Sequence, residues 1–381
     1  MANRRGNREG SLYFHKTRSR WCAQVSLNGH RVTKYGKTRG ECREWMKEML
    51  AKIDTGLTYE GTHVTVQSFI EMWLKGKELS RRPKTVLQYE QVVSQHIMAY
   101  LGKLRLQDVH PSHIKQLYAL KRDEGRGDRT VQLIHTILHN IFKQAVREGI
   151  LGRNPVDAVE RPKVEQSEMQ TLKEEQSREF LIAASGSSFE AIYYLALTTG
   201  MREGELLGLK WSDLDRNKSI LFVQRQLQHI PGQGYTLVPP KTKSGRREIK
   251  LGRGTLLELE AHEERQKAQK AVIGDAWQDN DLIFPNSHGK PLDNKRLRSE
   301  FKRILKTAGL PNIRFHDLRH TSLSTLMDNG TPVNTVQRRA GHAMASTTVN
   351  IYGHATARSQ DDAAEKIEEL VIPIAVKLQS N

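Results

Sequence analysis

Three short blocks of this chain hold side chains whose types and spacing suit one kind of chemistry. One is 316–321 (His-Asp-Leu-Arg-His-Thr), the second is Gly341-His342 with Tyr352 ten residues later, and the third is 199–209. Together they offer two arginines, two or three histidines and an isolated tyrosine. Permanently charged guanidinium groups bind phosphate oxygens in fixed geometry, and a phenolic oxygen can act as a nucleophile. The blocks lack the carboxylate cluster of a metal-dependent nuclease, so we expect a phosphodiester attacked by a tyrosine.

Two of these blocks place a pair of polar side chains on one face of a helix. Arg202 and Glu205 are three residues apart, as are His316 and Arg319, and residues at this spacing are neighbours on a helix surface. Each pair has an ordinary alternative: the first could be a surface ion pair, and His316 could be a satisfied core histidine beside a salt bridge. The order and spacing of all the blocks together favour a common site.

The third feature is the junction at Gly341-His342. It is expected between a helix over 332–340 and a helical turn that begins near Ser346, where a glycine permits close approach of the backbone. Tyr352 ends that last turn, and Gly353 beside it predicts a helix stop rather than a buried aromatic residue.

The composition favours a nucleic acid as the partner. The chain has 381 residues, enough for two or three domains, and its formal net charge is +17. At neutral pH such a chain attracts phosphate polyanions, although a generic basic protein is the alternative. Cys22 and Cys42 have no metal-ligand spacing, so we expect buried, reduced thiols. Neither a signal sequence nor an apolar run of membrane-spanning length is present, which predicts a soluble cytoplasmic protein without a membrane partner.

Residues 1–60 predict a small basic module. Alternation over 20–27 indicates a strand, the Asn28-Gly29 pair a hairpin turn, and 30–35 the return strand, with a third strand over 11–14. A helix backs this sheet; it begins with a capping box of Thr38 and Glu41.

The module has more than twice as many Lys and Arg as Asp and Glu, and small sheets can enter the major groove. We therefore expect it to bind DNA through the residues around its hairpin: Arg18, Arg20, Arg31 and Lys34.

Residues 64–152 predict an all-helical bundle, because three apolar stripes at helical spacing and a further helix after Pro111 indicate four helices with one core. Segment 153–170 is polar and without periodicity, which predicts a linker. Residues 171–381 are mixed α and β but mainly helical. Strands are predicted there over 219–223, 235–238 and 247–251.

The C-terminal half resembles the catalytic domain of the tyrosine recombinases, the phage integrase family. That family's signature is an arginine in a Thr-Gly-x-Arg-x-x-Glu turn, a lysine on a β-hairpin, a His-x-x-Arg helix, a Gly-His pair and a tyrosine nine or ten residues beyond it. Over about 171–360, the catalytic positions fall residue by residue on Arg202, Lys243, His316, Arg319, His342 and Tyr352, with Glu205 as a supporting acid. Lys241 is the alternative to Lys243.

The rest of the chain extends the resemblance. The helical bundle resembles the family's core-binding domain, and the basic module resembles the arm-binding domain of integrases that also recognise distal sites. The fold implied is therefore multidomain: a three-stranded sheet with a helix, an all-α bundle, and a mainly helical α+β catalytic domain.

The resemblance implies a site-specific DNA recombinase or integrase of a phage or an integrative element. Tyr352 would form a 3′-phosphotyrosyl bond and release a 5′ hydroxyl, while the two arginines clamp the phosphate. His342 would add a hydrogen bond, and His316 would donate to the phosphate or help to take the tyrosine proton. Lys243 would protonate the leaving oxygen. No metal and no nucleotide cofactor are required.

The expected partner is double-stranded DNA at specific attachment or recombination sites, bound by four protomers on two duplexes and assisted by accessory DNA-bending proteins. A type IB topoisomerase and a non-catalytic DNA-binding regulator are the alternatives. The C-terminal segment, with a helical pattern over 361–370 and an apolar run over 371–376, is expected to pack on its own domain or to dock on a neighbouring protomer.

Overall fold

The computed structural model describes residues 10–27, 30–54, 63–165, 169–240, 242–352 and residue 367. Its contacts divide the chain into two compact units, Met1–Gln166 and Ser167–Asn381. Among the described residues, no helix combines the length and the apolar character needed to cross a membrane.

The N-terminal residues form the predicted sheet and helix. Strands β1 (Ser11–His15), β2 (Arg20–Leu27) and β3 (His30–Gly36) are antiparallel in the order β1-β2-β3, and α1 (Arg39–Asp54) packs against them. The expected turn residues Asn28 and Gly29 lie outside the described residues. The Thr38 hydroxyl accepts from the Glu41 N–H at 3.2 Å, as the predicted capping box requires, while the Glu41 carboxylate accepts from the Lys37 N–H instead.

The two faces of this sheet differ. Val25 pairs with Val32 and packs with Trp45 and Met49 of α1, so α1 covers the Val25 face. Cys22 pairs with Tyr13 and with Tyr35, and therefore belongs to the opposite face. Cys22 and Cys42 are buried, as predicted, and neither forms a disulfide within the described residues.

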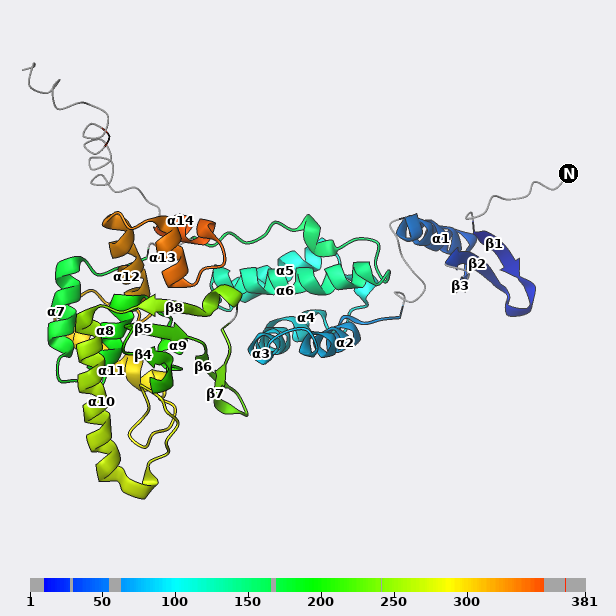
Figure 1. Ribbon diagram of the computed structural model, residues 1–381. Helices are drawn as coiled ribbons and strands as arrows, with labels where there is room; N and C mark the ends of the chain where they lie inside the picture. Colours follow the sequence, from blue (N-terminus) through cyan, green and yellow to red (C-terminus); the bar gives the residue numbers. More distant parts are fainter. Residues whose placement is uncertain are drawn as a thin grey trace, which may run out of the picture. The chain divides into compact units, whose positions relative to one another are not determined.

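The second part of the first unit is a helical bundle (Figure 1). Its elements are α2 (Val66–Glu78), α3 (Pro83–Val92), a π-helical segment (Val93–Ile97), α4 (Met98–Leu101), α5 (Pro111–Asp123) and α6 (Asp128–Arg147). An apolar stripe of α6 lies in the bundle core. Its residues recur at helical spacing and so share one face of the helix, and all four are buried: Val131, Ile134, Leu138 and Phe142. The segment expected as a linker begins on the bundle: Pro155–Ala158 is a 3-10 turn, and Val156 is buried in the same core.

The second unit contains helices α7 (Glu174–Ala184), α8 (Glu190–Thr199), α9 (Glu203–Leu206), α10 (Arg253–Ile273), α11 (Asn294–Thr307), α12 (Asp317–Asp328), α13 (Val333–Ala340) and α14 (Ala345–Tyr352). Its strands are β4 (Leu214–Asp215), β5 (Ile220–Val223), β6 (Gln226–Ile230), β7 (Gly234–Val238) and β8 (Arg247–Lys250). Packed rings of Phe180, Tyr193, Phe301 and Phe315 lie in its core.

The strands form two small antiparallel sheets, β4-β5-β8 and β6-β7. The three predicted strands correspond to β5, β7 and β8. The other two were not predicted, because β4 has only two residues and the apolar residues of β6, Leu227 and Ile230, are three positions apart and do not alternate. Figure 1 shows α12, α13 and α14 grouped at one end of the unit beside β8, and contacts join these elements. The C-terminal helix and apolar run expected over 361–376 lie, apart from residue 367, outside the described residues.

Candidate active site

The first arginine, Arg202, lies in a turn between α8 and α9. Gly200 ends α8 with φ 65°, a left-handed conformation that glycine adopts without strain. A Cβ atom at Gly200 would lie 3.1 Å from Leu323 of α12, so the glycine also allows α12 to approach. Arg202 is the N-cap of α9, and Glu205 accepts from its backbone N–H at 3.0 Å and from its guanidinium at 2.8 Å. Glu205 is only 2% exposed, so the pair is not a surface ion pair.

Glu205 also binds a residue that sequence reasoning missed. Arg247 of β8 donates to Glu205 Oε2 at 2.9 Å, to the Arg339 carbonyl at 2.7 Å and to the Gly245 carbonyl at 3.1 Å. Burial alone would raise the pKa of the Glu205 carboxyl, but Arg247 and then Arg202 outweigh burial and lower it. The sequence does indicate an inward position for Arg247. It lies two residues before the buried Ile249, and residues two apart in a strand share one face.

The second arginine, Arg319, lies on α12 and is 3% exposed. Its guanidinium donates to the Gly200 carbonyl at 2.7 Å, to the Ala340 carbonyl at 2.7 Å and to His342 Nε2 at 2.9 Å. It therefore joins the turn that precedes Arg202 to the junction that holds His342.

His342 follows Gly341, which ends α13 with φ 66°. Because Arg319 donates to Nε2, that nitrogen carries no proton, and Nδ1–H donates to Thr348 Oγ1 at 2.9 Å. Burial, followed by the charges of Arg319, Arg202 and Arg247, lowers the pKa of His342 to about 4. The ring is therefore neutral at pH 7.

His316 precedes α12 as its N-cap and reaches solvent. Desolvation, followed by the charges of His320, Arg319 and Arg202, lowers the pKa of His316 to about 4. Its ring meets that of His320 edge-on, with centroids 5.1 Å apart. A neutral His316 has one ring nitrogen that can accept a hydrogen bond at pH 7.

The structure corrects the expected place of Lys243. The lysine was expected on a β-hairpin, but β7 pairs with β6 and β8 pairs with β5, so the segment between β7 and β8 is not a hairpin. Lys243 is instead exposed and begins a 3-10 turn, Lys243–Gly245, on the connection between the two sheets. The turn still approaches the junction, because a Cβ atom at Gly341 would lie 3.0 Å from the Ser244 carbonyl oxygen. Lys241 lies outside the described residues.

Tyr352 is the last residue of α14, as predicted, and its side chain lies outside the described part of the chain. The helix that carries it is attached to the site through the contact between Thr348 and His342. The structure thus joins Arg202 to Glu205 and Arg319 to His342 by direct contacts, and the Gly200 carbonyl, which accepts from Arg319, links the two pairs. It adds the Lys243 turn and the helix of Tyr352 through neighbouring residues.

The four basic residues expected in the N-terminal module do not share one face. Arg31 pairs with Ser26 on the Cys22 face, and the Arg18 guanidinium lies 4.6 Å from the ring centre of Tyr35 on that face. Arg20 follows the same alternation. Lys34 pairs with Ala23 on the face covered by α1, where its ammonium lies 4.0 Å from Glu41.

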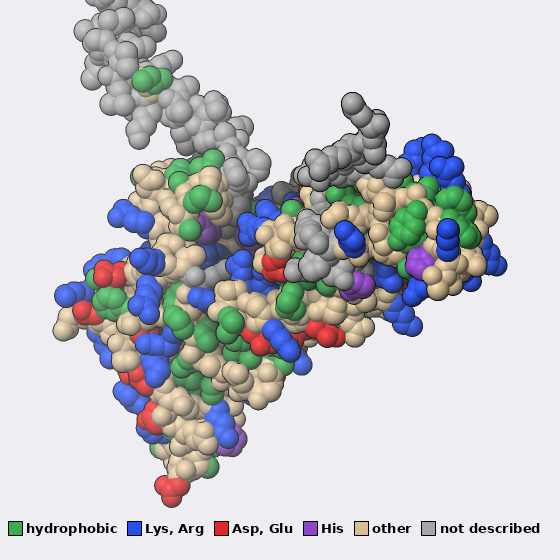
Figure 2. All heavy atoms as spheres, turned by 90° about the vertical axis from the view of Figure 1, so that its right-hand side faces the viewer, with side chains coloured by type: hydrophobic (Ala, Val, Ile, Leu, Met, Phe, Trp, Pro, Cys, Tyr) green, Lys and Arg blue, Asp and Glu red, His purple; other side chains and the backbone are tan. Residues whose placement is uncertain are grey.

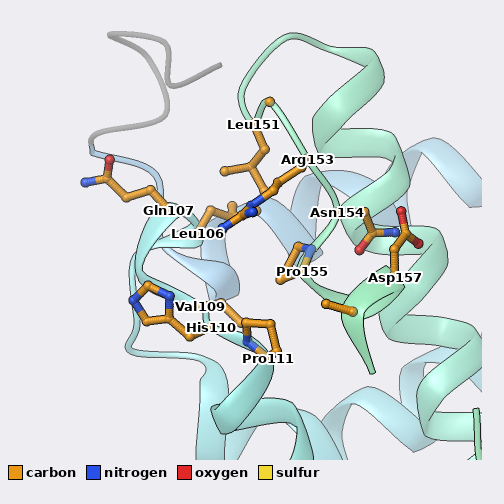
Figure 3. Close-up of a pocket in the computed structure, with 12 residues that line it drawn as sticks. Leu106, Gln107, Val109, His110, Pro111, Leu151, Arg153, Asn154, Pro155 and Asp157 are labelled. Atoms are coloured by element: carbon orange, nitrogen blue, oxygen red, sulfur yellow. The ribbon is translucent and has the colours of Figure 1, made fainter. Parts of the chain in front are cut away.

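The helical bundle contains a separate hollow of about 420 Å³, drawn in Figure 3. Its lining includes Leu106, His110, Asn154 and Asp157. Two of its polar members already serve the fold, because Asp157 pairs with His139 at 3.1 Å and Asn154 donates to the His139 carbonyl at 3.2 Å. This hollow is lined by residues of the first unit alone and contains none of the predicted catalytic residues.

Charge over the surface agrees with a polyanionic partner. Figure 2 shows Lys and Arg side chains spread over one face, with fewer Asp and Glu among them, as the net charge of +17 implies. Among the residues that the structure describes, no three His, Cys, Asp or Glu side chains converge as a metal ion would require.

Comparisons with known proteins agree with this geometry. The sequence pattern of the Phage integrase family matches residues 164–359, and that of the Phage integrase, N-terminal SAM-like domain, matches residues 65–119. The tyrosine recombinase XerC-like protein of Caldanaerobacter subterraneus subsp. tengcongensis is 30% identical over 368 residues, covering 91% of this chain and 94% of that protein.

Two solved structures share the fold. The Tn1549 transposon integrase in complex with a circular intermediate DNA has a TM-score of 0.70 at 24% identity, covering 80% of this chain and 99% of that one. A lambda integrase tetramer bound to a Holliday junction has a TM-score of 0.56 at 22% identity, covering 93% and 98%. The chain therefore belongs to the phage integrase family of tyrosine recombinases, which are site-specific DNA recombinases.

Proposed function

We propose that this recombinase cleaves DNA with Tyr352 and that Arg202, Arg319, His316, His342 and Lys243 form its catalytic site. The observation that carries the assignment is the network around Arg319, whose guanidinium contacts both the Arg202 turn and His342. Two guanidinium groups held in this way are suited to the non-bridging oxygens of a phosphodiester, whose negative charge increases as a nucleophile attacks phosphorus.

In the proposed cleavage step, the Tyr352 oxygen forms a bond to phosphorus while the bond from phosphorus to the 5′ oxygen breaks. The tyrosine proton passes to a base, and the 5′ oxygen receives a proton. A free tyrosine has a pKa near 10, so it is a poor nucleophile at pH 7 unless a base and nearby cations assist it. The lowered pKa of His316 leaves its ring neutral at pH 7, with a nitrogen able to accept the tyrosine proton, but it also makes the ring a weak base. The nearby guanidinium groups must therefore contribute to activating the tyrosine.

The exposed ammonium of Lys243 is suited to protonate the leaving 5′ oxygen. The product is a 3′-phosphotyrosyl bond and a 5′ hydroxyl. Attack by the 5′ hydroxyl of a second strand reverses the step and rejoins the DNA. Both ring nitrogens of His342 are engaged by Arg319 and Thr348, so we assign His342 first to holding Arg319 in place.

The proposed partner is duplex DNA at specific sites of a mobile element, handled in the cytoplasm of the host. Four protomers on two duplexes are proposed by analogy with the lambda integrase tetramer on a Holliday junction. Accessory DNA-bending proteins belong to this proposal as well.

The decisive experiment compares the intact chain with Tyr352→Phe on nicked DNA that contains the recombination site. The nick lets the cleaved 5′ end diffuse away, so covalent adducts accumulate. We expect adducts with the wild type, none with Tyr352→Phe, and equal DNA affinity for both. Adducts that persist in the Phe variant would assign the nucleophile to another residue, and wild-type binding without adducts would favour a DNA-binding regulator.

A further inference from the structure

Thr348 is a buried polar residue to which neither the family pattern nor the proposed chemistry gives a role. It is 0% exposed, while its neighbour Val349 is 45% exposed, so α14 turns Thr348 inward. Its hydroxyl oxygen lies 2.9 Å from His342 Nδ1. Helix α14 also contacts α12, which carries Arg319, and α13, which ends just before His342.

The contact differs from the usual role of a helical threonine. The hydroxyls of Thr136, Thr198 and Thr321 donate to carbonyls four residues earlier in their own helices. Thr348 instead meets a side chain from outside α14. Since Nε2 of His342 accepts from Arg319, Nδ1 carries the proton and the Thr348 oxygen accepts it.

The hydrogen bonds therefore run without interruption from the Gly200 carbonyl through Arg319 and His342 to Thr348. Tyr352 follows Thr348 by four residues, about one turn of the same helix. Fixing Thr348 thus fixes the backbone from which the tyrosine side chain extends. A displacement of about 1 Å in a reacting group can slow a reaction by roughly 10²-fold.

We propose that Thr348 is a positioning residue. Its hydroxyl, hydrogen-bonded to His342, fixes the helix of Tyr352 relative to Arg202 and Arg319, the two arginines proposed to bind the phosphate. This inference rests on the proposed role of Tyr352 as the nucleophile. It gives His342 a second task, since one ring connects the arginine that binds the phosphate with the helix that carries the attacking group.

The test uses two substitutions in the full-length chain that separate the hydroxyl from the packing. Thr348→Val keeps the shape and removes the oxygen, whereas Thr348→Ser keeps the oxygen and removes a methyl group. Single-turnover adduct formation on the nicked site should slow about tenfold or more for Thr348→Val and stay within about threefold of wild type for Thr348→Ser. A packing role predicts the reverse order, with Val tolerated and Ser impaired, and that result would overturn the proposal.

Two controls complete the test. DNA affinity and the denaturant midpoint identify any variant that fails to fold; if Thr348→Val does so, the Ser variant alone decides, because an impaired Ser variant contradicts the proposal. A double-mutant cycle with His342→Ala asks whether Thr348 acts through His342. Thr348→Val should add little to His342→Ala, and fully additive losses would refute the connection.

The same assay separates failure of this inference from failure of the proposed function. Adducts formed by Tyr352→Phe would remove the nucleophile assignment and this inference with it. Loss of adducts in Tyr352→Phe, together with wild-type rates in Thr348→Val, would reject only the role of Thr348.

Discussion

Arg247 and Glu205 form a buried ion pair in which Arg247 Nη2 lies 2.9 Å from Glu205 Oε2. The same carboxylate holds Arg202, and the same guanidinium holds the carbonyls of Gly245 and Arg339. This ion pair therefore connects the turn that carries Arg202, the turn that begins at Lys243 and the end of α13. Because the pair is shielded from water, its loss should affect both folding and the arrangement of the site.

Glu205→Ala should lower the free energy of unfolding by about 3–5 kcal/mol, since it leaves Arg247 buried without its carboxylate. The matched control is Glu264→Ala, which breaks the exposed ion pair with Lys267 and should cost less than about 1 kcal/mol. Denaturant unfolding of both variants measures the difference. Similar losses in the two variants would show that the Glu205 pair does not stabilise the fold.

Lys243→Ala should be strongly impaired on ordinary DNA but close to wild type when the leaving 5′ oxygen is replaced by sulfur, because a thiolate leaves without a proton. Arg202→Ala is the contrast: it should remain slow on both substrates, by about 10²-fold, since it stabilises charge on the non-bridging oxygens. Rates of adduct formation on the two substrates provide the measurement. If Lys243→Ala is equally slow on both, Lys241 becomes the residue to test.

The stability of the protein should fall as the pH drops from about 6.5 towards 4. His342 and His316 have pKa values lowered to about 4, whereas a histidine in the unfolded chain titrates near 6.5. Between these values the unfolded chain binds more protons than the folded protein, so stability is full above about pH 6.5 and declines below it.

Unfolding measured from pH 7 to pH 5 checks this prediction. His342→Gln should reduce the slope of the free energy of unfolding against pH by the equivalent of up to about one proton. An unchanged slope in His342→Gln would contradict the neutral state of His342 in the folded protein.

Arg31→Ala should weaken DNA binding more than Lys34→Ala, because only Arg31 lies on the sheet face that α1 leaves uncovered. Loss of one phosphate contact lowers the slope of log affinity against log salt by about one. Titration of a random-sequence duplex at several salt concentrations measures that slope for both variants. Equal effects would show that the face of the sheet does not determine DNA contact.

Local patterns in the sequence determined much of this protein. Apolar stripes at helical spacing predicted the bundle, because a helix forms where such a stripe can be buried. The order Arg202, His316-x-x-Arg319, Gly341-His342 and Tyr352 identified the candidate site, since reactive side chains are recognisable by type and spacing even before their surroundings are known. Each of these predictions depended on residues that lie close together in the chain or on a motif of fixed order.

Contacts between distant segments were decided only by the tertiary structure. Arg247 meets Glu205 across 42 residues and the Arg339 carbonyl across 92, and no local pattern names either partner. Lys243 was expected on a β-hairpin, but because β7 pairs with β6 it lies on a connection between two sheets. The local sequence does not distinguish Thr348 from other helical threonines, and only the packing of α14 brings its hydroxyl against His342. The physical reason is the same in each case: periodicity shows which face of an element is buried, but only packing decides which group that face meets.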